Sequence, residues 1–503
     1  MIPFILFFVT VITILYYYST RTLRYWKNKN VKGPEPMALF GNYYEMARRR
    51  KFIGEISRDA YNQFPNEKVI GMYTMVTPIL LVKDLDIIKQ ILIKDFDVFT
   101  DRGTDFSKDG LGANLFHADG DTWRVLRNYF TPLFTSGKLK NMTYLMTERA
   151  DMFLEHIDKI VRDQPEQEVH KLIQKFTISS ISACAFGIDM DIEQDHEFMK
   201  SITAFDKLIF DISYFIEIIM VYPDLMKKFN TSLFPKAIVN FFYDLVRKVV
   251  NDRKGVPIGR KDFMDLILEL KQQGEIKGTR RSDEKELQLD FNEDVMAGQA
   301  FAFYVAGYET SATAMTFMLY ELARNVNVQD KILAEIDEVL ERHNGKITYD
   351  SISDLKYMEK AFDETLRMYP VLDSLQRRAQ CDYKFPDLDL KIEKGQVIFI
   401  SPLAIHRDPN NYPDPDRFDP ERFNPENVRE RHPCAYIPFG LGPRNCIGMR
   451  FAKVQSRVCM MRLLSKYRVE MSEKTPRQVK LSPLRLIASP YGGMPLKIVP
   501  RRQ

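Results

Sequence analysis

The sequence predicts a mainly α-helical protein with small β-sheets, preceded by a single N-terminal transmembrane helix. Three observations support this expectation. The segment from Ile2 to Tyr18 carries no charged residue. Most of the remaining chain places apolar residues three and four positions apart, which is the spacing of one helix face. The stretches with strand character are short, as at residues 68–82. A net charge of +4 is also too small to indicate a nucleic-acid-binding protein.

Residues 1–20 are expected to be a membrane anchor, because about 20 apolar residues span a bilayer. Basic residues follow over 21–32 without an acidic one, so the positive-inside rule places the rest of the chain in the cytosol. A cleaved signal peptide is the alternative, but the segment lacks a positively charged start and a small-residue cleavage site. The aromatic residues suited to the membrane interface are Tyr16, Tyr17, Tyr18, Tyr25 and Trp26.

A basic, proline-rich hinge is expected over residues 21–36, since Pro34 and Pro36 restrict the backbone. Residues 37–503 show no linker or repeat and are expected to form a single domain. Its expected elements are, in order, two strands over 68–82, helices over 84–93 and from 121, helical periodicity over 140–250, and helices over 293–324, 355–369 and from 449. The charge-dense residues 251–292 are expected to be largely solvated, and the five prolines of 409–425 predict an irregular segment.

The strongest chemical signal is the stretch Phe439–Gly448, which reads FGLGPRNCIG. Cys446 lies in this Gly- and Pro-broken loop, directly before a helical apolar pattern. A helix N-terminus favours the thiolate form of a cysteine, and the glycines leave room beside the sulfur for a large, flat group. A buried structural cysteine is the ordinary alternative. Zinc is disfavoured because no C-x-x-C or H-x-x-x-H spacing occurs, and five scattered cysteines fit a reduced, cytosol-facing protein.

This stretch resembles the haem-binding loop of the cytochrome P450 monooxygenases, F-x-x-G-x-R-x-C-x-G, at every fixed position. The resemblance implies the cytochrome P450 fold and haem b (iron protoporphyrin IX), with Cys446 as the axial iron ligand and with Phe439 and Arg444 at the cofactor. Three segments, WRVLRNYFTPLFTSGKLK, AGYETS and PFGLGPRNCIG, are most similar to the microsomal insect family-six enzymes and the related vertebrate family-three enzymes. Those enzymes commonly oxidise xenobiotics such as plant toxins and insecticides.

Further cofactor contacts are expected from donor-only side chains. Trp123 and Arg127 are four residues apart and share a helix face. A packed tryptophan with a solvated arginine is the ordinary interpretation. The resemblance instead makes both residues donors to the haem propionates, whose carboxylates match indole and guanidinium groups. Arg102, Arg377 and Arg444 fall at further positions where related enzymes hold propionates.

The segment AGYETS lies inside the long helix expected over 293–324. Gly307 in mid-helix and a hydrogen bond from Thr310 back to the carbonyl of residue 306 favour a local widening of the helix. Close helix packing at a small residue is the alternative. The resemblance assigns Thr310 to orienting protons toward the dioxygen being reduced, and Glu309 to supplying those protons from solvent. The expected substrate contacts are Phe116, Ala302, Phe303, Ala306, Val371, Leu372 and Ser374.

Glu364 and Arg367 are three residues apart and meet on a helix surface. An exposed pair would contribute little to stability. The resemblance implies that the pair is buried and is completed by Arg422, which forms a structural ion triad that fixes the segment leading to the Cys446 loop.

The function implied is a monooxygenase of the endoplasmic reticulum membrane, with its catalytic domain on the cytosolic face and a hydrophobic small-molecule substrate. NADPH would act through a separate NADPH-cytochrome P450 reductase, with cytochrome b5 as a second candidate partner, because the chain has no flavin or nicotinamide fingerprint. Arg450, Lys453 and Arg457 form either a docking stripe for an acidic reductase or an ordinary solvated face. The alternatives are a haem-thiolate isomerase or dehydratase of lipid peroxides, and a non-catalytic haem sensor, both of which have less use for Glu309 and Thr310.

Overall fold

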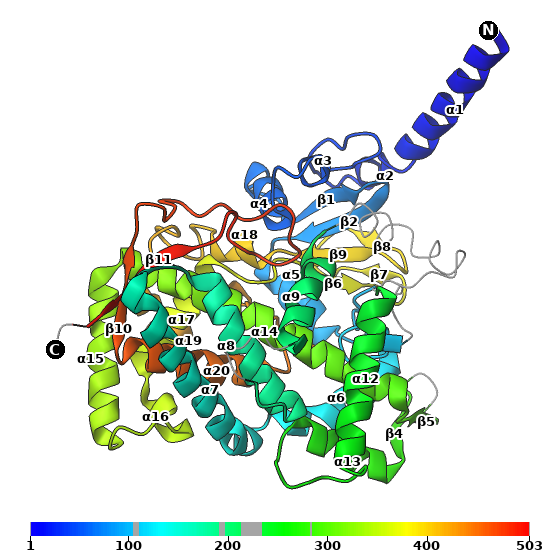
Figure 1. The fold of residues 1–503 in the computed structure, drawn as a ribbon. Helices are drawn as coiled ribbons and strands as arrows, with labels where there is room; N and C mark the ends of the chain where they lie inside the picture. The colour runs from blue at the N-terminus through cyan, green and yellow to red at the C-terminus, as the bar shows by residue number, and fades with distance from the viewer. Residues whose placement is uncertain (1, 104–109, 191–196, 213–233, 282–283, 502–503) are drawn as a thin grey trace.

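The computed structural model describes residues 2–103, 110–190, 197–212, 234–281 and 284–501. Within these ranges the protein is mainly helical, and small sheets lie at its periphery (Figure 1). The predicted fold class is therefore confirmed. Part of the aromatic stretch 205–225, which the resemblance places in a cavity roof, lies outside the described residues, as does Phe106 of the loop 103–121.

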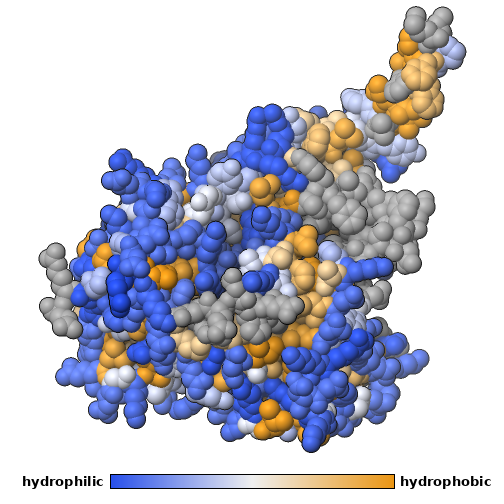
Figure 2. Space-filling view, viewed as in Figure 1, coloured by the Kyte–Doolittle hydropathy of each residue, from blue (hydrophilic) through white to orange (hydrophobic). Residues whose placement is uncertain are grey.

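Helix α1 (Ile2–Thr20) extends away from the body of the protein (Figure 1). Its surface is apolar (Figure 2), and Phe4 and Tyr16 are 68% and 64% exposed. Among the described residues, the span Pro3–Thr20 is the one helical stretch long and apolar enough to cross a membrane. An exposed apolar surface of this kind is unfavourable in water, so α1 is a candidate membrane anchor.

The chain after α1 packs onto the body of the protein. Trp26 of α2 (Tyr25–Asn28) is 2% exposed, and its indole N–H donates to the carbonyl of Met72 at 3.0 Å. The ring lies so close to Gly71 that a Cβ on Gly71 would come within 2.4 Å of it. The prediction that Trp26 lies at the membrane interface is wrong, because the ring is used in packing against the adjacent sheet.

That sheet has four strands, and it carries one of the predicted site residues. Its first two strands form the antiparallel hairpin expected over residues 68–82. The third strand pairs in parallel with the second, and the fourth, which contains Arg377, pairs in antiparallel fashion with the third. In spatial order the strands are β1 (Val69–Thr74), β2 (Thr77–Val82), β9 (Val397–Ile400) and β6 (Leu375–Arg378).

The remaining elements surround the central helix α14. The helices are α3 (Tyr44–Ala47), α4 (Ile53–Gln63), α5 (Leu85–Lys89) with a π-helical continuation (Gln90–Lys94), α6 (Gly120–Phe130), α7 (Ser136–Asp163), α8 (Val169–Phe186), α9 (Glu197–Phe210), α12 (Lys236–Asp252), α13 (Phe263–Gln273), α14 (Glu293–Arg324), α15 (Val326–Arg342), α16 (Tyr349–Asp354), α17 (Lys356–Met368), α18 (Pro402–His406), α19 (Pro425–Glu430) and α20 (Met449–Leu464). The other strands are β3 (Glu166–Glu168), β4 (Glu275–Thr279), β5 (Glu286–Asp290), β7 (Tyr383–Lys384), β8 (Lys391–Ile392), β10 (Tyr467–Met471) and β11 (Pro495–Pro500).

Helix α14 has the bounds predicted from the sequence and passes through the centre of the molecule (Figure 1). The side chain of Asn292 caps its first turn by accepting from the N–H of Val295 at 3.0 Å. The helix packs against α8, α12, α17 and α20, and most of its side chains are buried. A helix that is covered on all sides carries apolar residues on every face instead of in one amphipathic stripe, as α14 does.

The expectation of a solvated excursion over residues 251–292 is wrong for its middle part. Helix α13 lies in the core, with Phe263 and Met264 buried. Arg253 is itself buried, and its guanidinium pairs with Asp262 at 2.6 Å and with Asp265 at 2.7 Å. Charged residues can be buried when they neutralise one another with hydrogen bonds, and a count of charges along the sequence does not reveal such pairing.

Candidate active site

Cys446 lies in an irregular loop, and α20 begins three residues later at Met449. Backbone hydrogen bonds shape this loop. The N–H of Cys446 donates to the carbonyl of Phe439 at 2.8 Å, and the N–H of Asn445 donates to that of Gly442 at 3.1 Å. The loop therefore folds back on itself, and the Cys446 side chain keeps accessible surface. A loop followed directly by a helix is what the sequence predicted.

Gly442 and Gly448 of this loop have different surroundings. Gly442 has φ +77°, and a Cβ there would lie 1.9 Å from the carbonyl oxygen of Leu92. Gly442 thus allows the loop to approach the backbone of the π-helical turn that contains Leu92, and the expectation that it makes room beside the sulfur is wrong. A Cβ on Gly448 would meet nothing within 4 Å, so there is open space at this second glycine.

The Cys446 thiol is subject to opposing influences. Although part of the side chain is accessible, the protein atoms packed around the sulfur desolvate it and raise its pKa above the usual value. The backbone N–H of Gly448 and the charges of Arg127 and Arg102 act to lower the pKa. The balance is a raised pKa, so the helix N-terminus does not by itself produce the thiolate that was expected. A metal ion that binds the sulfur would displace the thiol proton. Cys446 could therefore act as a metal ligand even though its pKa as a free thiol is raised.

Four arginines from distant parts of the chain influence this site: Arg102, Arg127, Arg377 and Arg444. Burial lowers the pKa of Arg102, and the nearby charges of Arg444 and Arg377 lower it further. Burial and the charge of Arg444 lower the pKa of Arg377 to about 9. Burial lowers the pKa of Arg444 to about 10, although Asp119 opposes the shift. Such mutual repulsion indicates an excess of positive charge, which favours the binding of an anion.

Two of these arginines also support the cysteine loop. Arg127 donates from Nη1 to the carbonyl of Asn445 at 2.9 Å and from Nη2 to its Oδ1 at 2.7 Å. Arg444 donates to the carbonyl of Thr100 at 2.6 Å, and its guanidinium lies 5.1 Å from the ring centroid of Trp123. The structure thus brings Trp123, Arg127 and Arg444 together, while their role as propionate donors stays a prediction.

Haem b fits the chemistry of these residues. The Nε atoms of Arg377 and Arg444 are buried and have no hydrogen-bond partner among the residues that the structure describes. Two propionate carboxylates would supply both the acceptors and the negative charge, since guanidinium groups pair with carboxylates through forked hydrogen bonds. Cys446 would supply the iron ligand. Arg102 already donates to the carbonyl of Phe116 at 2.8 Å and still has further donor groups.

The acid–alcohol pair lies on α14. Thr310 donates through Oγ1 to the carbonyl of Ala306 at 2.6 Å, as expected. The helix nevertheless continues as a regular α-helix from 301 to 310, so the expected local widening is not found. A Cβ on Gly307 would lie 2.8 Å from Cδ1 of Ile181 in α8. Close packing of α14 against α8 is thus the physical reason for this glycine.

Glu309 is completely buried. Its carboxylate accepts from Nε2 of Gln174 at 2.6 Å and from Arg485 at 2.8 Å, and it lies 3.3 Å from Nε2 of His170. Burial alone would raise its pKa, but the charges of His170 and Arg485 outweigh this effect and lower it. Within the described part of the chain, these three side chains connect Glu309 to the surface, and no sequence pattern links them to it.

The expected substrate contacts divide into two groups. Accessible side chains remain at Phe116 and Leu372, which are 44% and 36% exposed, while Val371 is buried and Phe303 packs on other rings. Phe303 lies 4.4 Å from Phe263 and 5.3 Å from Phe134 between ring centroids, so packing accounts for its position. Ala306 is exposed although it lies on a mainly buried helix, and Ala302 and Ser374 are partly buried.

The ion triad is assembled as expected. Glu364 and Arg367 are both 0% exposed, and they form two hydrogen bonds of 2.6 and 2.9 Å. Arg422 lies 3.5 Å from the Glu364 carboxylate. Arg367 also donates to the carbonyl of His406 at 2.8 Å, and the N–H of Asp419 donates to Glu364 at 2.9 Å. The triad therefore ties α17 to the irregular segment that precedes the cysteine loop.

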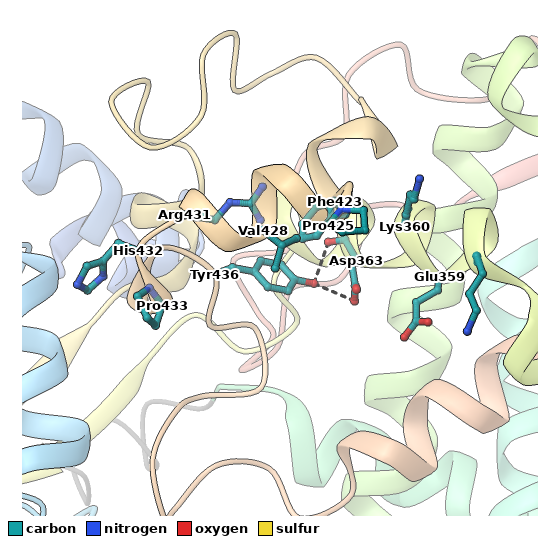
Figure 3. A pocket seen from close by; sticks show the side chains of 11 residues that line it. Glu359, Lys360, Asp363, Phe423, Pro425, Val428, Arg431, His432, Pro433 and Tyr436 are labelled. Atoms are coloured by element: carbon teal, nitrogen blue, oxygen red, sulfur yellow. Dashed lines mark hydrogen bonds between the residues drawn. The ribbon is translucent and has the colours of Figure 1, made fainter.

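Beside the triad, α17 and residues 423–436 line a pocket of about 610 Å³ (Figure 3). The hydroxyl of Tyr436 points across it to Asp363 and donates to the Asp363 carbonyl at 2.9 Å. Asp363 also pairs with Lys453 of α20 at 2.9 Å. Lys453 and Arg457 both pair with Glu359, so the predicted basic stripe is partly neutralised, while Arg450 is exposed.

The fold, the cysteine loop and the arginine cluster define a class of haem proteins in which a cysteine is the iron ligand. Comparison with known proteins agrees: the cytochrome P450 family model matches residues 31–494, and the chain belongs to this family. Among its relatives, cytochrome P450 6B2 of Helicoverpa armigera is 53% identical over 98% of this chain and 97% of its own length. Cytochrome P450 6B1 of Papilio polyxenes is 53% identical over 99% of this chain and 100% of its own length. Cytochrome P450 6a8 of Drosophila melanogaster is 37% identical over 99% of each chain.

Membership of the family implies haem as the cofactor and monooxygenase as the reaction class. It also implies a redox partner and hydrophobic substrates. The likeness to insect family-six enzymes that the sequence motifs indicated is confirmed by these relatives.

Proposed function

We propose that this protein is a membrane-anchored monooxygenase that oxidises hydrophobic xenobiotics, such as plant toxins or insecticides. Electrons come from NADPH through NADPH-cytochrome P450 reductase, with cytochrome b5 as an accessory donor. Residues 1–20 anchor the protein in the endoplasmic reticulum membrane, residues 21–36 connect the anchor, and residues 37–503 form one catalytic domain on the cytosolic side. The observation that carries the proposal is the accessible Cys446 beside a cluster of arginines in excess of their acidic partners.

In this proposal Cys446 holds the haem iron, and Phe439 lies beside the cofactor. Arg102, Trp123, Arg127, Arg377 and Arg444 hold its propionates. When bound, haem supplies the reductive cleavage of dioxygen, in which one oxygen atom enters the substrate and the other leaves as water. The protein contributes a fixed position for the substrate and a controlled supply of two protons. Exposed Arg450 is a candidate contact for the reductase.

The proton supply involves Thr310 and Glu309. The Thr310 hydroxyl donates to the Ala306 carbonyl, which leaves its oxygen lone pairs free to accept a hydrogen bond from water. Glu309 holds a proton-accepting carboxylate in the adjacent position on α14, surrounded by groups that connect it to the surface. Apolar substrates would contact Phe116, Ala302, Ala306, Leu372 and Ser374, with Val371 and Phe303 in supporting positions.

The decisive experiment combines a spectrum with turnover. Purified protein, reduced and exposed to carbon monoxide, is expected to show the strongly red-shifted Soret band of a cysteine-ligated haem. With reductase, NADPH and oxygen it should oxidise members of a panel of hydrophobic plant toxins and insecticides. Turnover of lipid peroxides without reductase would instead favour the isomerase or dehydratase, and a normal spectrum with no turnover in either assay would favour the haem sensor.

Replacing Thr310 by alanine should uncouple electron use from product formation. The hydroxyl is lost while the helix backbone is kept, so protons are delivered less accurately and oxygen is released as hydrogen peroxide. We expect the ratio of product formed to NADPH consumed to fall about tenfold. This loss is smaller than the roughly hundredfold or greater loss expected when a group that itself transfers the proton is removed. Thr143→Ala, which removes a buried and similarly back-bonded hydroxyl from α7, is the matched control. Tight coupling in Thr310→Ala would argue against this role.

A further inference from the structure

A surface pocket lies on the side of α14 where the Glu309 carboxylate is bound. Its volume is about 470 Å³, and three of its lining residues, His170, Gln174 and Arg485, contact Glu309. Glu309 itself has no exposed surface. A single layer of side chains therefore separates this buried carboxylate from water in the pocket.

Of these three partners, His170 is the one whose unperturbed pKa lies close to neutral pH. Its Nδ1 lies 3.2 Å from the hydroxyl oxygen of Thr316. That hydroxyl donates its own proton to the carbonyl of Ala312 at 2.7 Å, so the oxygen is left to accept from Nδ1–H. Nε2, the second nitrogen, faces Glu309 at 3.3 Å. The hydrogen-bonding pattern thus fixes one proton on Nδ1 and leaves Nε2 as the atom that gains or loses a proton.

From this geometry we infer that His170 is the proton donor that recharges Glu309 from the surface pocket. In this step the Nε2–H bond of the imidazolium breaks, and an O–H bond forms on Glu309, which leaves a neutral imidazole and a carboxylic acid. Water in the pocket then returns a proton to the imidazole. The ring lines the pocket, and 14% of the His170 side chain is accessible. The inference rests on the proposed proton relay and adds the residue that connects it to solvent.

The surrounding charges decide when His170 carries this proton. Burial lowers its pKa, but Glu309 on α14 and Glu168 at the start of α8 raise it, and Arg485 opposes them. The balance is a raised pKa. Arg485 is in turn held by Asp206 of α9 at 2.7 Å, and Lys171 lies at the pocket wall. A group with a raised pKa is protonated below that pKa and loses its proton as the pH rises through it, so the proton supply should fail on the alkaline side.

The titration of His170 can be measured without turnover. Diethylpyrocarbonate modifies the neutral imidazole, and peptide mass spectrometry of the full-length holoenzyme reports the modification of each histidine as a function of pH. In Glu309→Gln the midpoint for His170 should fall by at least about one pH unit, because the carboxylate that raises it is gone. His343, which pairs with Asp354 at 2.9 Å elsewhere on the protein, should be modified to the same extent in wild type and Glu309→Gln. An unchanged His170 midpoint in Glu309→Gln would overturn the inference.

The functional arm uses reductase, NADPH and the probe 7-ethoxycoumarin between pH 6 and 9. The wild-type ratio of product to NADPH should fall as the pH rises through the His170 midpoint. His170→Gln should have about a tenfold lower ratio at neutral pH, since pocket water only partly replaces a positioned proton donor, and its ratio should no longer depend on pH in this range. His343→Gln should behave as wild type. A His170→Gln enzyme with the wild-type pH profile and solvent deuterium isotope effect would exclude this role.

The two arms separate the inference from the proposed function. If the wild-type enzyme forms no product from any substrate, the proposed function fails, whereas the diethylpyrocarbonate titration still decides whether Glu309 controls His170. Haem content and the carbon monoxide spectrum of His170→Gln should equal those of wild type. If this variant does not retain haem, the comparison of wild type with Glu309→Gln by diethylpyrocarbonate decides the inference.

Discussion

Arg367→Ala is expected to yield protein that does not retain haem. Arg367 donates two hydrogen bonds to the buried carboxylate of Glu364. Removing the guanidinium leaves this carboxylate without its charged partner, which should lower the free energy of unfolding by about 3–5 kcal/mol. The carbonyl of His406 and the segment before the cysteine loop lose their link to α17 at the same time. The pyridine haemochrome assay and the thermal unfolding midpoint measure both effects.

An exposed ion pair provides the control. Arg342 and Glu338 are four residues apart on α15, 3.1 Å from each other and largely exposed, and Arg342 also pairs with Asp354 at 3.2 Å. Arg342→Ala should therefore cost no more than about 1 kcal/mol. Burial raises the pKa of Glu364 even with Arg367 present, and a carboxyl with a raised pKa in the folded state gains stability as the pH falls. The destabilisation by Arg367→Ala should thus be smaller at pH 5 than at pH 8. Normal haem content would refute the structural role of the triad.

Cys446→Ser is expected to abolish monooxygenase activity and the red-shifted carbon monoxide band together. A serine hydroxyl stays protonated and does not donate electron density to iron as a thiolate does. We expect product formation to fall at least about a hundredfold, which corresponds to about 2.7 kcal/mol in the barrier. The backbone bonds that shape the loop do not involve the sulfur, so the fold should be retained.

The matched control is Cys381→Ser, because Cys381 is also accessible but lies outside the loop. That variant should keep the spectrum, the haem content and the rate of wild type. Far-ultraviolet circular dichroism of Cys446→Ser checks that helix content is unchanged. A persistent red-shifted band in Cys446→Ser would mean that another residue is the iron ligand.

Much of the fold is visible in local patterns. Helix α14 has the bounds that its periodicity indicated, and the hairpin of β1 and β2 lies where two short apolar runs are separated by a turn. Predictions based on composition were less accurate. Helix α13 is buried despite its charged surroundings, because Arg253 is neutralised by two aspartates that composition alone cannot pair with it.

The sequence alone determined the chemistry of this protein: a cysteine in a glycine-rich loop, an acid beside an alcohol on one long helix, and an ion pair one helix turn apart. Such features involve residues close together in the chain, so their spacing fixes their geometry. Only the tertiary structure decided what surrounds them. It brought Asn445 to Arg127 and joined Glu309 to His170 and Arg485, contacts between residues more than 130 positions apart. Contacts at such separations depend on how helices pack, and helix periodicity carries no information about which helices become neighbours.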